Sequence, residues 1–422
     1  MNQSKSNPFW RSVDIRQFWW GQLAAAVGAR VTREGLPIVA IVAASATASQ
    51  VGIMAALATL PALVLGNLLG QWVDSHKKRP LLVGASLIRT VLLSLIPVLY
   101  LLHRLSFPIL ALITALTAAT GVLQAISRHA YLPFLVSRKH LETGHHLVET
   151  AESVGETVGP GLMGLLIKSI GAPFAMLFDA FANIIAAFFF ALVSKQEARA
   201  VKRPASPSPL PQTWYVWKQI ARHPALNPLW YNAGASSFFG GFFSALYEFY
   251  VLKTLSLSPL WLGILITLGG LGSLVGTGLY KPLRKYLSLT QVIFWGYLAY
   301  ALFNTAVPLA HGALWESFLF LFAAQFGGDL FATISQISAF TLEQEVTPDP
   351  WLGQVRGSFE ALSGGLEVAG ALVSGTLAVF IPIQSIMAIA VAGLIGATLF
   401  LANKSLLHFP KDGTRWTSSY WL

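Results

Sequence analysis

Cysteine is absent from this sequence and charged residues are scarce, and each shortage excludes a class of protein. Without cysteine, the 422-residue chain forms no disulfide and offers no thiolate to a metal. Nine histidines are present, but apart from the adjacent His145 and His146 none has ligand-type spacing, so we expect no metal site. Charged residues make up 11% of the chain and hydrophobic residues 55%, which is far from the averages of soluble domains.

The motifs of common catalytic sites are also missing. The sequence contains no HExxH, GxSxG or paired-aspartate motif and no nucleotide-binding loop of the GxxxxGKS or GxxxxGKT type. We therefore predict that the protein is not an enzyme, has no catalytic residues and no cofactor, and is not driven by ATP. The net charge of +10 is compatible with nucleic-acid binding, but the cations lie in short loops between apolar runs, so we expect no nucleic-acid partner.

Long apolar runs account for nearly the whole chain. A hydrocarbon core about 30 Å thick is spanned by about 20 apolar residues in a helix, and a backbone in lipid must satisfy its own polar groups. The runs are continuous rather than alternating, which favours helices. The sequence predicts an all-α membrane protein with twelve transmembrane helices in two six-helix bundles. The predicted helices are 18–45, 49–73, 81–102, 108–127, 145–169, 172–194, 227–252, 258–280, 290–310, 313–342, 357–380 and 383–403.

A long polar segment divides the predicted helices into two sets of six. We expect residues 1–194 to form one bundle, 195–226 a cytoplasmic linker, and 227–422 a second bundle with a short tail. The first part of the linker is rich in proline and serine, which is typical of a connector. The second part fits a short amphipathic helix at the membrane surface, because it interleaves aromatic and basic residues. These residues are Trp214, Trp217, Lys218 and Arg222. Six helices, a linker and six more helices are typical of a duplicated transporter.

Lysine and arginine predict the orientation in the membrane. Most of the 28 lysines and arginines fall in the N-terminus, the linker, the C-terminus and the loops after the second, fourth, eighth and tenth predicted helices. The opposite loops contain only Arg104, Lys168 and Lys253. Because cytoplasmic loops carry an excess of lysine and arginine, we expect both termini to be cytoplasmic, in a bacterial inner membrane.

The loop between the second and third predicted helices carries a motif. It contains Gly70, then Asp74 four residues later, and a basic cluster with Lys78 and Arg79. This motif resembles the loop 2–3 signature of the major facilitator superfamily, although Ser75 stands where a basic residue is usual. Such a carboxylate caps a facing helix N-terminus and pairs with nearby cations. We predict that these residues stabilise one access state; the alternative is a basic loop that only sets topology.

The fifth predicted helix carries a second motif, made of Gly155, Gly159, Pro160 and Gly164. It is similar to the glycine–proline signature of antiporters in the same superfamily. Glycines four residues apart give a smooth face for close helix packing, and Pro160 removes one backbone hydrogen bond. We expect this segment to take part in gating, with ordinary small-residue packing as the alternative.

Shorter segments are similar to the macrolide-efflux and enterobactin-exporter branch of the superfamily. They are Trp20-Gly21-Gln22, Tyr131 to Val136, Phe178-Asp179-Ala180, Thr347-Pro348-Asp349 and Gly353 to Val355. The resemblance covers almost the whole chain. It implies proton-driven efflux of a small organic molecule by two bundles that rock around a site near the bilayer midplane.

Charged residues inside the predicted first helix indicate a binding site. Arg30, Arg33 and Glu34 have spacings of three and four, which place them on one helix face. A charge at the bilayer centre costs about 2.5–3.5 kcal/mol on insertion scales, so each needs a partner or a water-filled cavity. We predict that these residues bind an anionic substrate. A structural ion-pair network between the first and fifth helices is the alternative.

Acidic residues inside other predicted helices are candidate proton carriers. Glu152 and Glu156 lie in the fifth helix, Asp329 in the tenth and Glu367 in the eleventh. Burial and neighbouring charges move the pKa of such carboxylates, which suits them to proton coupling. Pairing with the arginines is the alternative role.

Together these observations predict a proton-coupled secondary transporter that exports a small organic molecule by alternating access. The two arginines favour an anionic, carboxylate-type siderophore, because guanidinium pairs carboxylate bidentately. A multidrug or macrolide efflux pump and an importer of the same fold remain alternatives. A non-transporting membrane sensor is an alternative of another class. We expect protons, the substrate and membrane lipid as partners, and a monomeric chain.

Overall fold

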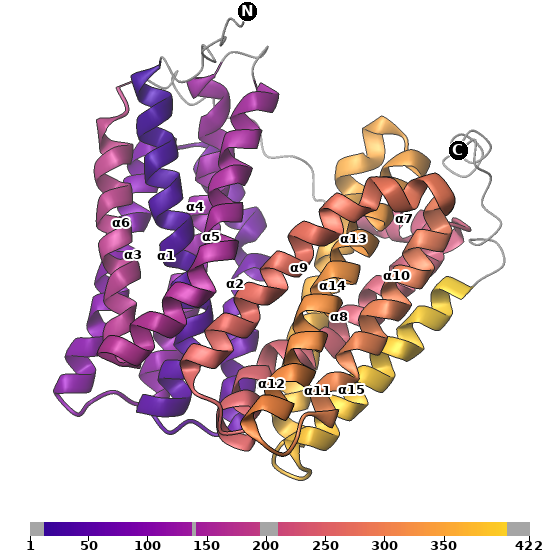
Figure 1. Cartoon of the computed structure of the whole chain (residues 1–422). Coiled ribbons are helices and arrows are strands. Elements are labelled where there is room, and N and C mark those ends of the chain that lie inside the picture. The colour runs from indigo at the N-terminus through magenta and orange to yellow at the C-terminus, as the bar shows by residue number, and fades with distance from the viewer. Residues whose placement is uncertain (1–11, 137–140, 195–209, 403–422) are drawn as a thin grey trace, which may run out of the picture. The chain divides into compact units, whose positions relative to one another are not determined.

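The computed structural model describes residues 12–136, 141–194 and 210–402, and within these ranges every regular element is a helix (Figure 1). The proline-rich part of the predicted linker, residues 195–209, and the tail after residue 402 lie outside the described residues, as do residues 1–11. The prediction of an all-helical protein is therefore confirmed for the part of the chain that the structure describes.

The helices follow one another with short connections. The first six are α1 (Val13–Ala43), α2 (Ala48–Asp74), α3 (Lys78–Leu101), α4 (Phe107–Leu135), α5 (Leu141–Ile170) and α6 (Ala172–Leu192). The next are α7 (Leu210–Arg222), α8 (Leu226–Phe249), α9 (Pro259–Tyr286), α10 (Leu289–Asn304) and α11 (Ala306–Leu309). The last are α12 (Leu314–Phe322), α13 (Gly328–Val346), α14 (Leu352–Leu377) and α15 (Ile383–Thr398). Two π-helical turns, Tyr250–Thr254 and Ala323–Gly327, extend α8 and join α12 to α13. Short 3-10 turns, Asp349–Trp351 and Leu399–Ala402, precede α14 and follow α15.

Each of the twelve predicted spans has a helical counterpart. Eight of the described helical segments are long and apolar enough to cross a membrane by length and composition alone. The other four counterparts, α1, α5, α8 and α14, contain more charged, polar or small residues, and this lowers their hydropathy. The polar side chains in these four helices are therefore candidates for functional residues.

The chain divides into two units. Unit 1 comprises Met1–Thr47, Leu57–Pro204 and Pro259–Thr267. In unit 1, α1 packs against α5 and α6, and α3 packs against α4 and α6 (Figure 1). Glycines every seven residues on α1 allow the close approach to α6: a Cβ at Gly21 would lie 2.7 Å from the Phe190 ring, and one at Gly28 would overlap Asp179.

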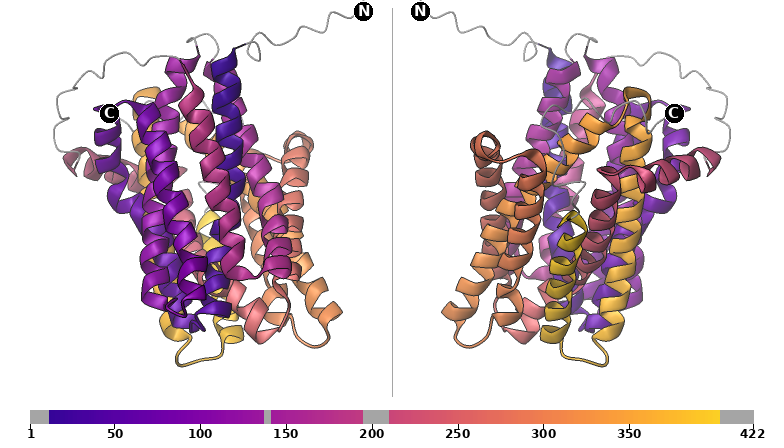
Figure 2. Two further views of the ribbon diagram at one scale, coloured as in Figure 1. Left: turned by 90° about the vertical axis from the view of Figure 1, so that its left-hand side faces the viewer. Right: turned by 90° about the vertical axis from the view of Figure 1, so that its right-hand side faces the viewer.

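Unit 2 comprises Ala48–Ala56, Ala205–Ser258 and Leu268–Leu422. In unit 2, α8 packs against α14 and α15, and α10 packs against α13. A hydrophobic cluster lies where α8, α10 and α14 begin and where α13 and α15 end; it includes Leu226, Ile293, Val346 and Val355. The short helix α7 packs on the same cluster and lies across the neighbouring helices rather than parallel to them (Figure 2).

Candidate functional site

The charged face predicted on α1 pairs with acidic residues of α5 within unit 1. Arg30 Nη1 lies 3.1 Å from Glu156 Oε2, and Arg30 Nη2 lies 3.2 Å from Glu34 Oε1. The side chains of Arg30 and Glu34 are 15% and 13% exposed, so this pair is largely removed from solvent. Arg30 is therefore compensated by two carboxylates, as expected for a charge inside a membrane-spanning helix.

The glycine motif of α5 creates the space in which Arg30 lies. A Cβ at Gly159 would lie 2.6 Å from both Cβ and Cγ of Arg30, and a Cβ at Gly155 would lie 2.9 Å from the Ala26 backbone. Pro160, the next residue along the helix, is buried. The arginine stem crosses α5 where that helix has no side chain. The two motifs that the sequence presents separately thus meet in one contact.

Gly164 lies farther along α5 and faces a different element. A Cβ at this position would lie 2.9 Å from the Pro259 carbonyl oxygen, in the first turn of α9, which belongs to unit 1. The glycines of α5 therefore allow close packing against two elements. Gly155 and Gly159 lie against α1, and Gly164 lies against the start of α9.

Arg33 differs from Arg30 in its surroundings. Its side chain is 71% exposed, and its described ion pair is a long one, 3.9 Å from Arg33 Nη1 to Glu156 Oε1. Arg33 lies five residues from the midpoint of the 31-residue helix α1, which is about 8 Å along the axis. An exposed guanidinium at this depth requires contact with water or with an anion, because lipid would not solvate it.

Glu152 belongs to a second polar cluster, one turn before Glu156. Its carboxylate accepts a hydrogen bond from Gln22 Nε2 at 2.8 Å and forms an ion pair with Arg128. The predicted end of this helix at residue 127 is wrong: α4 continues to Leu135, so Arg128 lies inside the helix and not in a loop. The cluster ties together α1, α4 and α5.

Asp329 lies at a backbone irregularity in unit 2. It occupies the first turn of α13, directly after the π-helical turn Ala323–Gly327. Gln325 Nε2 donates to Asp329 Oδ2 at 3.5 Å, and a Cβ at Gly269 of α9 would overlap the same carboxylate. Single π-helical turns are frequent at functional sites.

The remaining proton-carrier candidate, Glu367, lies on α14 and is partly buried. Its backbone carbonyl packs against Gly241 of α8, where a Cβ would overlap it. Glu367 therefore lies at the tight contact between α8 and α14.

The motif between α2 and α3 divides into packed and exposed residues. Lys78 is 6% exposed, donates to the Asp74 carbonyl at 3.3 Å, and lies 5.9 Å from the centre of the Phe134 ring. Arg79 donates to the Ala191 carbonyl of α6. The side chain of Asp74 is exposed, and a Cβ at Gly70 would meet no atom within 4 Å. The cations of the motif thus contribute to packing within unit 1, and Asp74 stays open to solvent.

Arg89 and Asp179 form a buried ion pair between α3 and α6. Arg89 Nη2 lies 2.8 Å from Asp179 Oδ2, and the two side chains are 8% and 0% exposed. Asn183 donates to Asp179 Oδ1 at 2.7 Å, and Arg89 also donates to the Thr117 carbonyl at 3.3 Å. Every partner belongs to unit 1 and lies in its interior, which indicates a structural role.

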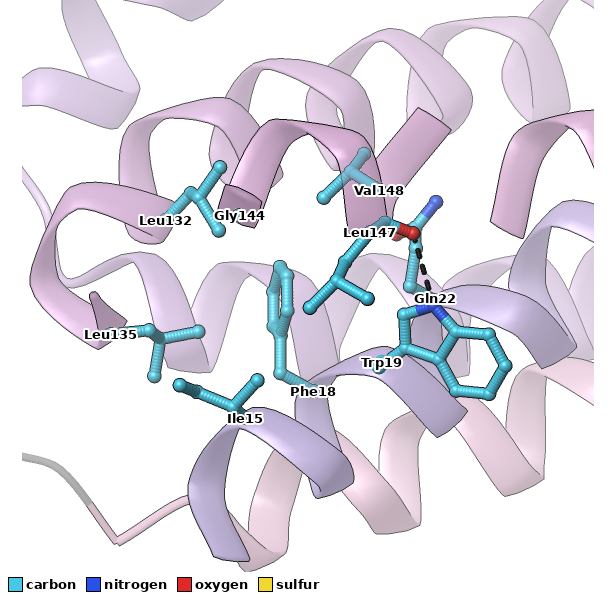
Figure 3. Close-up of a pocket in the computed structure, with 9 residues that line it drawn as sticks. All are labelled: Ile15, Phe18, Trp19, Gln22, Leu132, Leu135, Gly144, Leu147 and Val148. Atoms are coloured by element: carbon cyan, nitrogen blue, oxygen red, sulfur yellow. Dashed lines mark hydrogen bonds between the residues drawn. The ribbon is translucent and has the colours of Figure 1, made fainter. Parts of the chain in front are cut away.

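A small cleft between α1, α4 and α5 is too small for a ligand. Its volume of about 10 Å³ holds a single water molecule at most. Figure 3 shows its apolar lining and the hydrogen bond of 3.0 Å from Trp19 Nε1 to the Leu147 carbonyl. It is lined by Ile15, Phe18, Trp19, Gln22, Leu132, Leu135, Gly144, Leu147 and Val148.

Comparison with known proteins assigns the family. Paired charges inside long apolar helices, a glycine-lined contact and two units define a polytopic membrane protein of the secondary-transporter type. The Major Facilitator Superfamily sequence model matches residues 18–366, and the chain belongs to that superfamily. It is therefore an integral membrane transporter and not an enzyme. No curated protein sequence matches.

Solved structures with the same fold are distant in sequence. One is a bacterial homologue of the iron transporter ferroportin in an inward-facing state, with TM-score 0.73, 16% identity, and coverage of 93% of this chain and 98% of that chain. Another is the nucleoside transporter NupG, with TM-score 0.70, 12% identity, and coverage of 92% and 98%. An auto-inhibited peptide transporter of the POT family has TM-score 0.71, 13% identity, and coverage of 92% and 96%. At these identities the likeness shows the fold alone.

Proposed function

We propose that the protein is a proton-coupled transporter that exports a small carboxylate-bearing anion, such as a siderophore, with both termini in the cytoplasm of a bacterial cell. The observation that carries the proposal is Arg33, whose side chain is 71% exposed near the middle of α1 and beside a compensated Arg30. Its guanidinium offers a bidentate site for a carboxylate. Arg30, three residues before Arg33, forms ion pairs with Glu34 and Glu156.

The solved structures do not select a substrate. They are a homologue of an iron transporter, a nucleoside transporter and a peptide transporter, and iron, nucleosides and peptides share no chemistry. The choice of an anion therefore rests on the charges of unit 1. We propose residues 1–194 and 227–422 as the two bundles that move during transport, joined by the linker.

The partner of Arg33 constrains which carboxylate carries the proton. Protonation of Glu156 would remove its charge and free Arg33 for an anion, while Arg30 would remain paired with Glu34. Proton and anion would then load together, as in symport. An exporter driven by an inward proton gradient requires the opposite, namely that proton and substrate exclude one another. Glu156 is therefore a poor proton carrier for export.

Asp329 is the carboxylate that we propose for export. It lies in unit 2, directly after a π-helical turn, where its carboxylate accepts from Gln325 and lies against Gly269 of α9. Unlike protonation of Glu156, protonation of Asp329 would not free Arg33 for an anion, so it does not favour loading of the proton and the anion together. Two other acids are weaker candidates for the proton carrier. Glu152 forms an ion pair with Arg128 and accepts from Gln22, and Glu367 lies at the contact between α8 and α14.

A second candidate function follows from the contact between Arg33 and Glu156. If Glu156 is the proton carrier, the protein imports the anion together with a proton. The two candidate functions predict opposite changes of pH inside a vesicle when the anion moves inward.

The experiment uses proteoliposomes with a trapped pH indicator and no imposed pH gradient. Citrate, as a small carboxylate, or erythromycin, as a macrolide, is added outside. Inward movement of citrate should make the lumen alkaline if the protein exchanges it for protons, and acidic if the protein carries both together. A response to erythromycin alone would overturn the anionic substrate class.

Three variants and one control variant assign the response to residues. Arg33→Gln should abolish the citrate response, whereas Lys168→Gln, which removes a cation at the far end of α5, should leave it unchanged. Asp329→Asn should abolish an alkaline response, and Glu156→Gln an acidic one. A normal response from inserted Arg33→Gln protein would refute the proposed site.

A further inference from the structure

The helix α7 has one buried face that fixes its position. Val216 and Ile220, one turn apart on this 13-residue helix, are both fully buried in the hydrophobic cluster of unit 2. At its C-terminal end, His223 Nδ1 accepts from the backbone N–H groups of Ala225 and Leu226, each at 3.2 Å. These bonds fix the turn into α8. The helix α7 is therefore a fixed part of unit 2.

The opposite face of α7 carries aromatic and basic side chains. Trp214, Trp217, Lys218, Ala221 and Arg222 have spacings of three and four, which form one stripe along the helix. All five residues are exposed, Trp214 to 70%. Exposing two tryptophan side chains to water is unfavourable, whereas tryptophan and lysine or arginine on one face are typical of a helix at a membrane interface.

The position of α7 places this stripe at one end of the bundle. The cluster beneath it joins the starts of α8, α10 and α14 to the ends of α13 and α15. Because these helices cross the membrane, their common end lies at the level of the lipid headgroups. The helix α7 lies across that end (Figure 2), so its stripe runs along the headgroup layer.

The charges at this end favour anionic headgroups. The sequence of α7 contains no acidic residue. The described ion pairs nearby join Arg356 to Glu343 and Glu360, and they do not include Lys218 or Arg222. Two exposed cations thus face the layer in which phosphodiester groups lie.

We propose that the exposed stripe of α7 (Trp214, Trp217, Lys218, Ala221 and Arg222) binds the headgroups of anionic phospholipids such as phosphatidylglycerol. The tryptophans lie at the depth of the headgroups and the acyl ester bonds, and the cations contact the phosphates. This inference rests on the membrane location of the fold and is independent of the substrate.

The test measures lipid contact at α7 directly. Because the chain has no cysteine, Ala221→Cys carries a single bimane label on the stripe. The labelled full chain is reconstituted in phosphatidylcholine vesicles that contain brominated phosphatidylglycerol or, at the same mole fraction, brominated phosphatidylcholine. Brominated phosphatidylglycerol should quench the label more strongly. Each cation removed should weaken the apparent affinity for this lipid about fivefold.

Charge-matched variants separate a local site from a general attraction. Lys218→Gln with Arg222→Gln should reduce quenching to the phosphatidylcholine level, and Lys218→Arg with Arg222→Lys should retain it. Lys281→Gln with Lys285→Gln, which removes the same charge from exposed positions of α9, should leave it unchanged. Equal quenching by the two lipids in the wild type would overturn the proposal. So would undiminished selectivity after loss of both α7 cations, in protein with an unchanged melting temperature.

Discussion

Arg89 and Asp179 show how a single residue depends on its partner inside the bundle. Among the described ion pairs theirs has the least exposed side chains, at 8% and 0%. Removing one partner from a buried pair leaves a charge without compensation and costs about 3–5 kcal/mol, whereas replacing both with apolar residues is often neutral. Asp179 is therefore more sensitive to substitution than Glu156, which is 53% exposed.

This difference gives a prediction for unfolding in detergent. Asp179→Leu should lower the melting temperature strongly, because Arg89 loses its carboxylate and Asn183 loses an acceptor. Adding Arg89→Met should restore most of the loss. A double variant as unstable as the single one would show that the charge of Arg89 is not the cause.

Gly159 makes a second prediction at the residue scale. An alanine Cβ would lie 2.6 Å from the stem of Arg30, so α1 and α5 must separate. Overpacking of this kind costs about 1–3 kcal/mol. Gly159→Ala should lower the melting temperature and weaken transport, and Gly159→Leu should do so more strongly. Gly84→Ala is the control, since a Cβ there meets nothing within 4 Å. Equal effects at the two positions would contradict the contact.

At the scale of elements, hydropathy predicts where helices lie but not where they end. The twelve predicted spans correspond to helices, yet α4 runs to Leu135 instead of 127 and α9 to Tyr286 instead of 280. Both extensions open with a basic residue, Arg128 in α4 and Lys281 in α9, where the apolar run stops although the helix continues. The prediction ended them at the first polar stretch.

The π-helical turns and the inter-helix contacts were not predictable in the same way. Ala323–Gly327 has no proline, and its conformation depends on the packing of α12 and α13 with their neighbours. The contact between Arg30 and Gly159 joins residues 129 positions apart. The seven-residue spacing of Gly21, Gly28 and Gly35 was a signal in the sequence, and it would have indicated the α1–α6 interface.

Two glycines of α9 provide a matched prediction at this scale. A Cβ at Gly276 would overlap the Leu330 carbonyl oxygen of α13, whereas one at Gly278 would meet nothing within 4 Å. Gly276→Ala should lower the melting temperature by forcing the two helices apart. Gly278→Ala should leave it unchanged or raise it, because alanine is favoured over glycine in a helix by about 1 kcal/mol. Similar melting temperatures for both variants would show that α9 and α13 do not pack this closely.

At the scale of the whole molecule, the charged groups of the two units differ in their partners. In unit 1 three arginines inside the helices, Arg30, Arg128 and Arg89, pair with Glu156, Glu152 and Asp179 respectively, whereas the side chain of Arg33 is 71% exposed. In unit 2 the carboxylate of Asp329 accepts a hydrogen bond from the Gln325 amide. In the proposed function the two bundles alternate between access states, so a residue that changes this equilibrium acts without touching the substrate.

Asp74 is the residue for which we predict such an effect. Its side chain is exposed, while Lys78 of the same motif is packed within unit 1, so the carboxylate is available to stabilise one access state by capping or charge pairing. Asp74→Asn keeps the size and removes the charge. It should shift the access equilibrium and slow turnover, with little change in substrate affinity.

Single cysteines on the α1–α5 face read out this equilibrium, because the native chain has no cysteine. Glu149→Cys and Arg33→Cys lie about 20 Å apart along the helix axes, since Arg30 is level with Gly159. With a membrane-impermeant thiol reagent, the Asp74→Asn background should raise labelling at one position and lower it at the other. Asp74→Glu, which retains the charge, should stay close to the parent. If labelling at both positions and turnover are unchanged in Asp74→Asn, the motif sets only the topology of its loop, and the access equilibrium is determined by contacts elsewhere in the two units.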